Sequence, residues 1–311
     1  MDVAALVEGV LAGERRAIAR AISAVEDDAP VLPELSAGIY GHTGRAATIG
    51  VTGAPGVGKS TFAGELVRLA RAEDLRAAVL AVDPTSPYTG GALLGDRVRM
   101  QDHAVDPGVF IRSMATRGHL GGMALAAPEA VRILDAAGHD VILVETVGVG
   151  QAEVDVAAAT DTAVVVLAPG MGDAVQIAKA GILEAADVFV VNKADRDGAA
   201  DVAKELRQML HLGAARDWDP PVLMVSAARS EGVDEAWAAV REHRERAEST
   251  GALAAKRRAR LLREAESLAA ERFRVRAATA LEDDPALAED LVERRTDPYR
   301  AAEELLRRAT T

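Results

Sequence analysis

Short apolar runs alternate with helix-like stretches between about residue 46 and residue 226. Runs rich in β-branched residues and separated by helices are typical of a mostly parallel sheet with helices on both faces. The pattern therefore predicts an α/β fold. The expected strands are 47–52, 77–82, 109–114, 141–145, 163–168, 188–192 and 222–226.

Both ends of the chain have a different pattern. Within 14–27, Ile18, Ile22 and Val25 recur at the spacing that places them on one face of a helix. Beyond Trp237 the chain is rich in Arg, Glu, Ala and Leu, as in the predicted helix 254–273. The expected organisation is a helical extension over 1–40, a central α/β domain over 41–245 and a helical region over 246–311.

Composition excludes several classes of protein. The formal net charge of -12 argues against binding to nucleic acid or to an anionic membrane surface, since both need clustered cations. No stretch approaches the ~20 apolar residues that a membrane span needs, and the N-terminal sequence lacks the pattern of a signal peptide. The absence of cysteine excludes disulfides and thiolate chemistry, and the six scattered histidines do not form a zinc motif.

A phosphate-binding loop follows the first predicted strand. The sequence "ATIGVTGAPGVGKST" matches the pattern G-x-x-x-x-G-K-[ST] in the order strand, glycine loop, helix. Backbone N–H groups of such a loop surround a phosphate, its lysine contacts the β- and γ-phosphates, and its serine hydroxyl binds Mg²⁺. The predicted nucleotide-binding residues here are Gly53, Ala54, Pro55, Gly56, Val57, Gly58, Lys59, Ser60 and Thr61.

A second motif indicates guanine as the base. The run "VFVVNKAD" ends a predicted strand in Asn192, Lys193 and Asp195. A carboxylate at this position can accept both the N1–H and the 2-amino group of guanine, and adenine offers neither in that arrangement. One strand later, Ser226 and Ala227 occupy the place of a loop whose backbone N–H meets guanine O6. An Asn-Lys-Asp loop is also an ordinary turn, but its order after the phosphate loop favours GTP.

Three acidic residues at predicted strand ends or in loops are candidates for the magnesium region. Asp83 closes one strand, Asp96 lies in a loop, and Glu145 ends the strand 141–145, at the sheet edge where ligands gather in such folds. We predict Ser60, Asp83 and Glu145 around Mg²⁺, directly or through water, since that ion keeps several waters. An alternative for Asp96 is a helix cap or a turn.

Two of these acids and the lysine of the phosphate loop form the predicted catalytic group. Glu145, Lys59 and Asp96 are the candidate catalytic residues, and the longer side chain of glutamate suits contact with a metal-bound or attacking water. Gly148 is expected to contact the γ-phosphate through its backbone N–H, which makes 146–155 a candidate switch. Gln151 lies three residues beyond that glycine, so we assign it no role as a water-positioning glutamine.

With these motifs assembled, the chain resembles the MeaB/ArgK family of GTPases associated with methylmalonyl-CoA mutase. The matching stretches cover most of 48–235. They are "GVTGAPGVGKST", "VDPTSPYTGGALLGDRVRM", "FIRSMATRGHLGG", "ILVETVGVGQAE", "APGMGDAVQIAKAGILEAADVFVVNKAD" and "VSAARSEGVDE".

The resemblance implies a homodimeric GTPase whose C-terminal helices form the dimer and which uses GTP or GDP with Mg²⁺. It implies a cytoplasmic chaperone of an adenosylcobalamin-dependent acyl-CoA mutase that gates cofactor loading and protects or reactivates that enzyme. It also implies a third switch over 169–181, with Asp173, Gln176 and Lys179 between nucleotide and partner. Without the resemblance, we would interpret that segment as an ordinary strand-to-helix loop in which Asp173 is the N-cap of the following helix.

Two other functions compete with the chaperone GTPase. ArgK-type proteins suggest a kinase of transport proteins, although the sequence offers no evident set of residues for a phosphoryl acceptor. A metal-insertion GTPase is the other alternative, and the lack of cysteine and of clustered histidine argues against it.

Overall fold

The computed structural model describes residues 2–84, 105–116, 122–146, 152–170, 182–212 and 217–309. The chain divides into two compact units, Met1–Arg257 and Arg258–Thr311. The boundaries predicted at residues 40 and 245 stay predictions.

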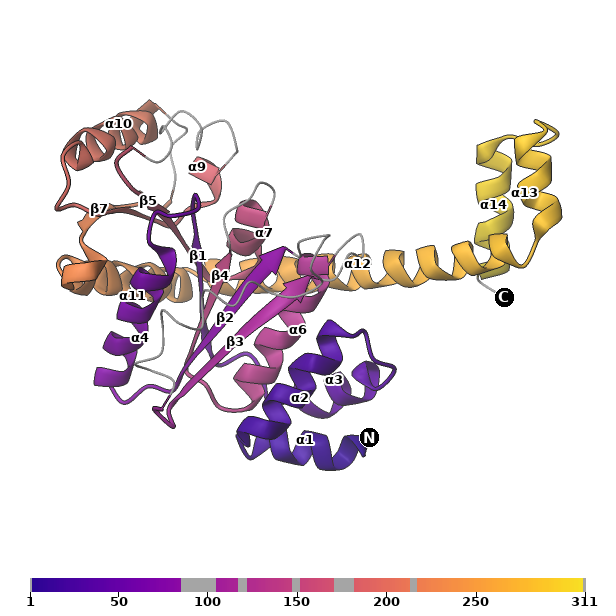
Figure 1. Cartoon of the computed structure of the whole chain (residues 1–311), viewed down its shortest axis with the longest axis horizontal. Coiled ribbons are helices and arrows are strands. Elements are labelled where there is room, and N and C mark those ends of the chain that lie inside the picture. The colour runs from indigo at the N-terminus through magenta and orange to yellow at the C-terminus, as the bar shows by residue number, and fades with distance from the viewer. Residues whose placement is uncertain are drawn as a thin grey trace. The chain divides into compact units, whose positions relative to one another are not determined.

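A parallel sheet forms the centre of the first unit (Figure 1). In the described part of the chain it has seven strands in the order β3-β2-β4-β1-β5-β6-β7, and every neighbouring pair is parallel. The strands are β1 (Ala47–Thr52), β2 (Ala77–Pro84), β3 (Val109–Thr116), β4 (Val141–Thr146), β5 (Thr162–Leu167), β6 (Val188–Asn192) and β7 (Val222–Val225). All the predicted strands are present, which confirms the α/β class.

Helices cover both faces of this sheet because its strands carry buried side chains on both sides. Leu66 of α4 (Lys59–Ala72) and Trp237 of α11 (Val233–Ser249) pack in one cluster with Leu143. On the other face, Ile133 of α6 (Gly122–Ala136) packs with Val144. Helices α7 (Ala152–Ala159), α9 (Ile182–Ala185) and α10 (Ala199–Leu212) pack on that face as well.

The N-terminal residues form three helices, α1 (Val3–Leu11), α2 (Arg15–Glu26) and α3 (Leu32–Tyr40). Ile18 and Ile22 are fully buried, as their spacing predicts, and they join the cluster that contains α6. The helical extension therefore shares a core with the sheet.

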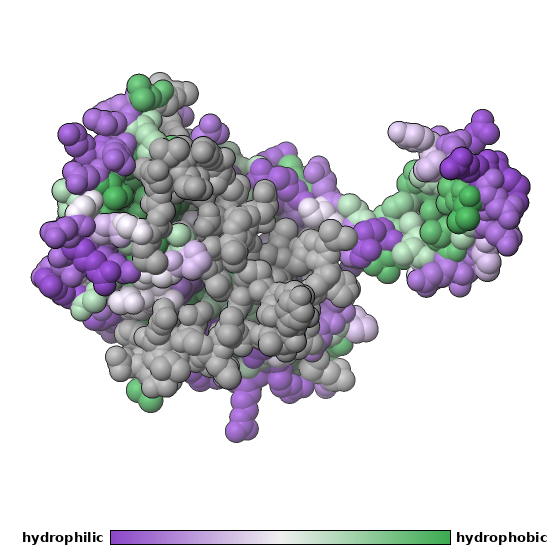
Figure 2. Space-filling view, turned by 45° about the horizontal axis from the view of Figure 1, so that its top comes forward, coloured by the Kyte–Doolittle hydropathy of each residue, from purple (hydrophilic) through white to green (hydrophobic). Residues whose placement is uncertain are grey.

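The last helices are α12 (Ala252–Glu282), α13 (Pro285–Val292) and α14 (Pro298–Ala309). In the second unit α13 and α14 contact each other, and Arg308 Nη1 lies 2.6 Å from Asp284 Oδ2. Figure 2 shows hydrophobic residues gathered on these helices between stretches of hydrophilic surface. Leu262 of α12 is 54% exposed. None of the helices described combines the length and apolarity needed to cross a bilayer.

Candidate nucleotide site

The phosphate loop lies between β1 and α4, as the motif predicts. Gly53 has a φ of +139°, and a Cβ there would lie 2.1 Å from the carbonyl oxygen of Val166 in β5. Gly58 has a φ of +97°, and a Cβ there would lie 2.4 Å from Asn192 Nδ2. Both positions therefore need glycine, because the backbone is left-handed and another chain segment passes close by.

Lys59 begins α4 and is buried. Its Nζ donates hydrogen bonds to the carbonyl oxygens of Gly53 at 2.8 Å and Ala54 at 3.1 Å. The ammonium group thus lies against the loop whose backbone N–H groups are predicted to hold phosphate.

Ser60 and Glu145 meet across the end of the sheet. Glu145 pairs in register with Val51 of β1, which brings the end of β4 beside the phosphate loop. The Ser60 hydroxyl donates a 2.6 Å hydrogen bond to Glu145 Oε1, and both side chains are buried. Two residues predicted to surround Mg²⁺ are therefore in direct contact.

The oxygen donors at this point fit Mg²⁺ better than a softer metal. Mg²⁺ takes a hydroxyl, one or two carboxylates, phosphate oxygens and water. Over the described ranges no group of three or more His, Cys, Asp or Glu side chains could hold a metal. Ser60 and Glu145 would therefore bind the ion together with oxygens of the nucleotide and water.

The other predicted residues of this region are only partly visible. The backbone of Asp83 lies near the end of β2, one residue beyond the pair Val82 and Thr146, which places it at the same sheet edge as Glu145. Its side chain lies outside the described residues, as do Asp96, Gly148 and the switch-like residues Asp173, Gln176 and Lys179.

The predicted guanine motif is hydrogen-bonded to the phosphate loop. Asn192 ends β6, and its Nδ2 donates to the carbonyl oxygen of Val57 at 2.8 Å. Its Oδ1 accepts from the backbone N–H of Ala227 at 3.0 Å. Lys193 Nζ donates to the carbonyl oxygen of Gly56 at 2.7 Å. Segments far apart in the sequence thus form one network around the predicted base and phosphates.

Asp195 is held by the loop after β7. Ser226 Oγ donates a 2.8 Å hydrogen bond to Asp195 Oδ1, and Arg229 Nη2 lies 3.5 Å from Asp195 Oδ2. The Ser226 hydrogen bond is the main cause that lowers the pKa of Asp195, and the charges of Arg229 and Arg196 lower it further. The carboxylate is therefore ionised at neutral pH and can accept hydrogen bonds from guanine.

Sequence reasoning missed two contributors to this region. Arg229 lies in the short 3-10 helix η2 (Ala227–Arg229), two residues after Ala227, but the predicted guanine motif does not include it. The buried hydroxyls of Thr52 and Thr146 contact each other at the ends of β1 and β4. Only their positions beside Gly53 and Glu145 could have suggested them.

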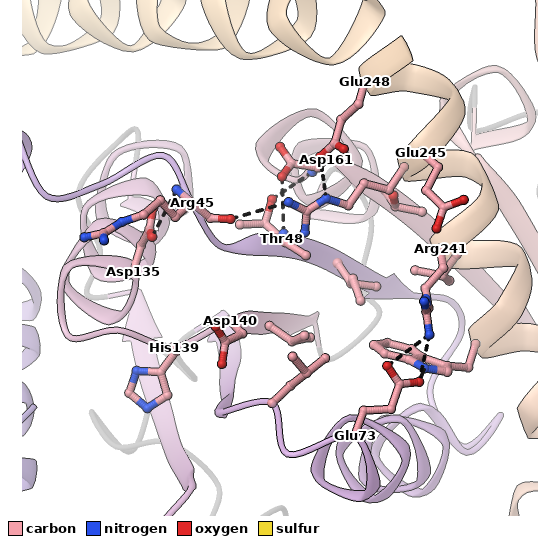
Figure 3. Close-up of a pocket in the computed structure, with 18 of the residues that line it drawn as sticks. Arg45, Thr48, Glu73, Asp135, His139, Asp140, Asp161, Arg241, Glu245 and Glu248 are labelled. Atoms are coloured by element: carbon pink, nitrogen blue, oxygen red, sulfur yellow. Dashed lines mark hydrogen bonds and ion pairs between the residues drawn. The ribbon is translucent and has the colours of Figure 1, made fainter.

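A cavity of about 670 Å³ lies at the opposite end of β1 and β4 (Figure 3). Two ion pairs lie along its lining: Arg241 Nη1 of α11 lies 2.9 Å from Glu73 Oε1 at the end of α4, and Arg244 Nε lies 2.8 Å from Glu248 Oε1 within α11. Because this cavity lies at the starts of β1 and β4, at the end of the sheet opposite to the phosphate loop, we assign it no part in nucleotide binding.

A parallel sheet with a glycine-rich phosphate loop between β1 and α4 defines a P-loop nucleotide-binding protein. Residues 18–282 match the family model "Methylmalonyl Co-A mutase-associated GTPase MeaB". The chain belongs to this family of GTPases, which confirms the resemblance read from its motifs.

Relatives agree with this membership. A protein of Pyrococcus horikoshii named "Putative GTPase" is 47% identical over 305 residues, which cover 97% of this chain and 96% of the relative. GTPase ArgK of Escherichia coli is 42% identical over 237 residues, 73% of this chain and 72% of that protein. The crystal structure of a "LAO/AO transport system kinase" superposes with a TM-score of 0.72 at 28% identity, covering 99% of this chain and 98% of that one.

Proposed function

We propose that this GTPase hydrolyses GTP to GDP and phosphate with Mg²⁺ and acts as a chaperone of an adenosylcobalamin-dependent acyl-CoA mutase, methylmalonyl-CoA mutase in the first instance. The observation that carries the nucleotide assignment is the network of Asn192, Lys193 and Asp195. It joins the predicted guanine motif to the phosphate loop and to the loop after β7. The name of the family supports the partner.

In the proposed reaction each residue of the site has a separate task. Lys59 binds the β- and γ-phosphates, while backbone N–H groups of 53–58 surround them. Ser60 and Glu145 hold Mg²⁺ directly or through water, and the ion, when bound, offsets charge on the phosphate oxygens. Glu145 also accepts a hydrogen bond from a water near the γ-phosphate, as a base or as a group that orients it. Asp195 selects guanine.

We propose that the chain hydrolyses GTP slowly when no partner is bound. Hydrolysis by P-loop GTPases depends on positioned charges around the γ-phosphate, and a partner that supplies or orders such groups raises the rate by large factors. The mutase is the proposed partner of this kind. The nucleotide state in turn gates cofactor loading and protects or reactivates the mutase.

We also propose that this GTPase is a cytoplasmic homodimer whose two chains contact each other through the helical region 246–311. Exposed apolar side chains on α12 and α14 support this assembly, because large apolar groups on a surface favour contact with another chain. They are Leu261, Leu262, Leu268, Val275, Tyr299 and Leu306.

The similarity to a protein described as a transport system kinase favours a second candidate, a kinase that transfers the γ-phosphoryl group to a protein. A kinase must hold an acceptor hydroxyl or carboxylate next to that phosphate. A metal-insertion GTPase is less well supported, since the chain has no cysteine and its described residues contain no candidate metal cluster.

Steady-state GTP hydrolysis by the purified chain with Mg²⁺ tests the proposal, alone and with excess methylmalonyl-CoA mutase from the same genome. We expect slow release of free phosphate that rises severalfold with the mutase, and its loss in Lys59→Ala. An unchanged rate would refute this mutase as the stimulating partner. Transfer of labelled γ-phosphate to protein, without release of free phosphate, would favour the kinase.

A further inference from the structure

Two buried hydroxyl groups meet where β1 and β4 end. Thr52 Oγ1 and Thr146 Oγ1 lie 3.2 Å apart, and neither side chain is exposed. The parallel register explains the contact: Val51 pairs with Glu145, so the next residue of each strand lies beside the other. A buried hydroxyl without a hydrogen bond lowers the stability of the folded state by about 1–3 kcal/mol. The contact between the two hydroxyls is therefore favoured as long as water does not reach them.

The two hydroxyls lie on the face of the sheet opposite to the Glu145 carboxylate. Side chains alternate along a strand, and in β4 Leu143 belongs to the cluster with α4 while Val144 belongs to the cluster with α6 and α7. Glu145 accordingly points towards Ser60 of α4, and Thr146 points towards the side of α7. Hydrogen bonds therefore hold the end of β4 to the phosphate-loop region from both faces.

The two threonines are direct neighbours in the sequence of residues of the proposed site. Thr52 directly precedes Gly53, the first residue of the phosphate loop, and Thr146 directly follows Glu145. Helix α7 packs closely against β1 here, since a Cβ on Gly50 would lie 2.6 Å from Val156 Cγ1. The hydroxyl contact thus joins two strands at the point where one enters the phosphate loop and the other leaves for α7.

We propose that Thr52 and Thr146 are a positioning pair that sets the location of the Glu145 carboxylate relative to the phosphate loop. They are not catalytic residues, because they face away from Ser60. The inference rests on the proposed GTP hydrolysis. Displacing a positioned group by about 1 Å can lower a rate by about two orders of magnitude, so a directional bond one residue away affects turnover more than nucleotide affinity.

Substitution by valine separates the hydrogen bond from the volume of the side chain. We expect Thr146→Val to lower kcat for GTP about tenfold while the Kd for GDP stays within about twofold, and Thr146→Ser to retain kcat. The double variant Thr52→Val, Thr146→Val leaves no unpaired hydroxyl, so it should regain the stability that either single variant loses. Its kcat should remain low, because the directional bond is still absent.

Thr48→Val is the matched control on the same strand. Its hydroxyl accepts a 2.8 Å hydrogen bond from the backbone N–H of Asp161 at the far end of the sheet, so the variant should lose stability and keep kcat. Wild-type kcat in Thr146→Val, or in the double variant, would overturn the inference, as would a change confined to KM. A wild-type protein that hydrolyses no GTP would instead overturn the proposed function, and the inference with it.

Discussion

Lys193 Nζ donates a 2.7 Å hydrogen bond to the carbonyl oxygen of Gly56, although 137 residues separate the two along the chain. Lys193 has a positive φ of 58°, which turns the chain sharply at the end of β6. Asn192 makes a parallel contact with Val57. The residues predicted to select the base and those predicted to bind phosphate are therefore held as one unit, and a change in either affects the position of the other.

Asp195→Asn is expected to exchange the preferred nucleotide from GTP to XTP. In the proposed binding mode the carboxylate would accept two hydrogen bonds from guanine, whereas the amide of asparagine presents a donor that suits the additional carbonyl of xanthine. A polar group of the base left without its partner lowers affinity roughly tenfold or more. Competition binding of GTP and XTP measures the exchange.

Asp197→Asn is the matched control, because Asp197 is exposed and lies two residues further along the same loop. It should leave the preference for GTP unchanged. If Asp195→Asn binds GTP as the wild type does and ignores XTP, Asp195 does not read the base.

Glu145→Gln should lower kcat about 100-fold and leave GDP binding intact. Glutamine keeps the shape of the side chain and can still contact the Ser60 hydroxyl, but it lacks the charge needed to bind Mg²⁺ or to polarise a water. Single-turnover hydrolysis with saturating Mg²⁺ gives the rate, and Glu205→Gln, on the exposed side of α10, is the control. A rate within about twofold of wild type would remove Glu145 from the mechanism.

The strand pattern could be predicted because a parallel sheet buried on both faces needs continuous apolar runs, and these are visible in the sequence. The phosphate loop could also be predicted, since its motif is contiguous in the sequence and needs left-handed backbone at Gly53 and Gly58. Contacts between segments that are far apart in the sequence could not be predicted. The bond between Ser60 and Glu145 depends on strand order, because it requires β4 to lie next to β1.

Strand order also explains what sequence reasoning missed. Thr52 and Thr146 become neighbours only through the register of β1 with β4. Arg229 approaches Asp195 only because β7 pairs with β6. Threonine in a strand is common and arginine is abundant in this chain, so none of the three residues stands out before the strands are placed.

Arg257→Ala should destabilise the first unit by about 3 kcal/mol, because it removes the charged partner of the buried Asp161 carboxylate. Arg257 Nη2 lies 2.5 Å from Asp161 Oδ2, and it also donates to the carbonyl oxygen of Ala46 at 2.9 Å. The hydrogen bond with Asp161 raises the pKa of Arg257. Urea denaturation measures the loss, with the neighbouring exposed residue changed in Arg258→Ala as control. Equal midpoints for the two variants would contradict this prediction.

Asp187 provides a test that depends on pH. Its Oδ1 lies 3.2 Å from His243 Nε2, and its Oδ2 lies 3.3 Å from Lys256 Nζ and accepts from the backbone N–H of Ala163 at 2.9 Å. Burial raises the pKa of Asp187, but the hydrogen bond with His243 and the charges of Lys256 and His243 outweigh it. The net pKa lies below the ordinary 3.8.

A lowered carboxyl pKa means that the folded state binds the proton less well than the unfolded state. The stability contributed by ionised Asp187 is therefore fully present above the ordinary pKa and is lost as the pH falls through the lower folded value. Asp187→Asn should be less stable than wild type by about 1–3 kcal/mol at neutral pH. That difference should shrink below about pH 4, near the unfolded pKa.

Chemical denaturation at a series of pH values gives the two stability curves, with Asp219→Asn, at an exposed position, as the control. The wild-type and Asp187→Asn curves should converge in acid, while the control follows the wild type throughout. If the difference in unfolding free energy between the two proteins stays constant down to the lowest pH measured, Asp187 stabilises the junction between α9 and β6 through shape and neutral hydrogen bonds. In that case its charge would contribute nothing to holding α11 and the first residues of α12 against the sheet.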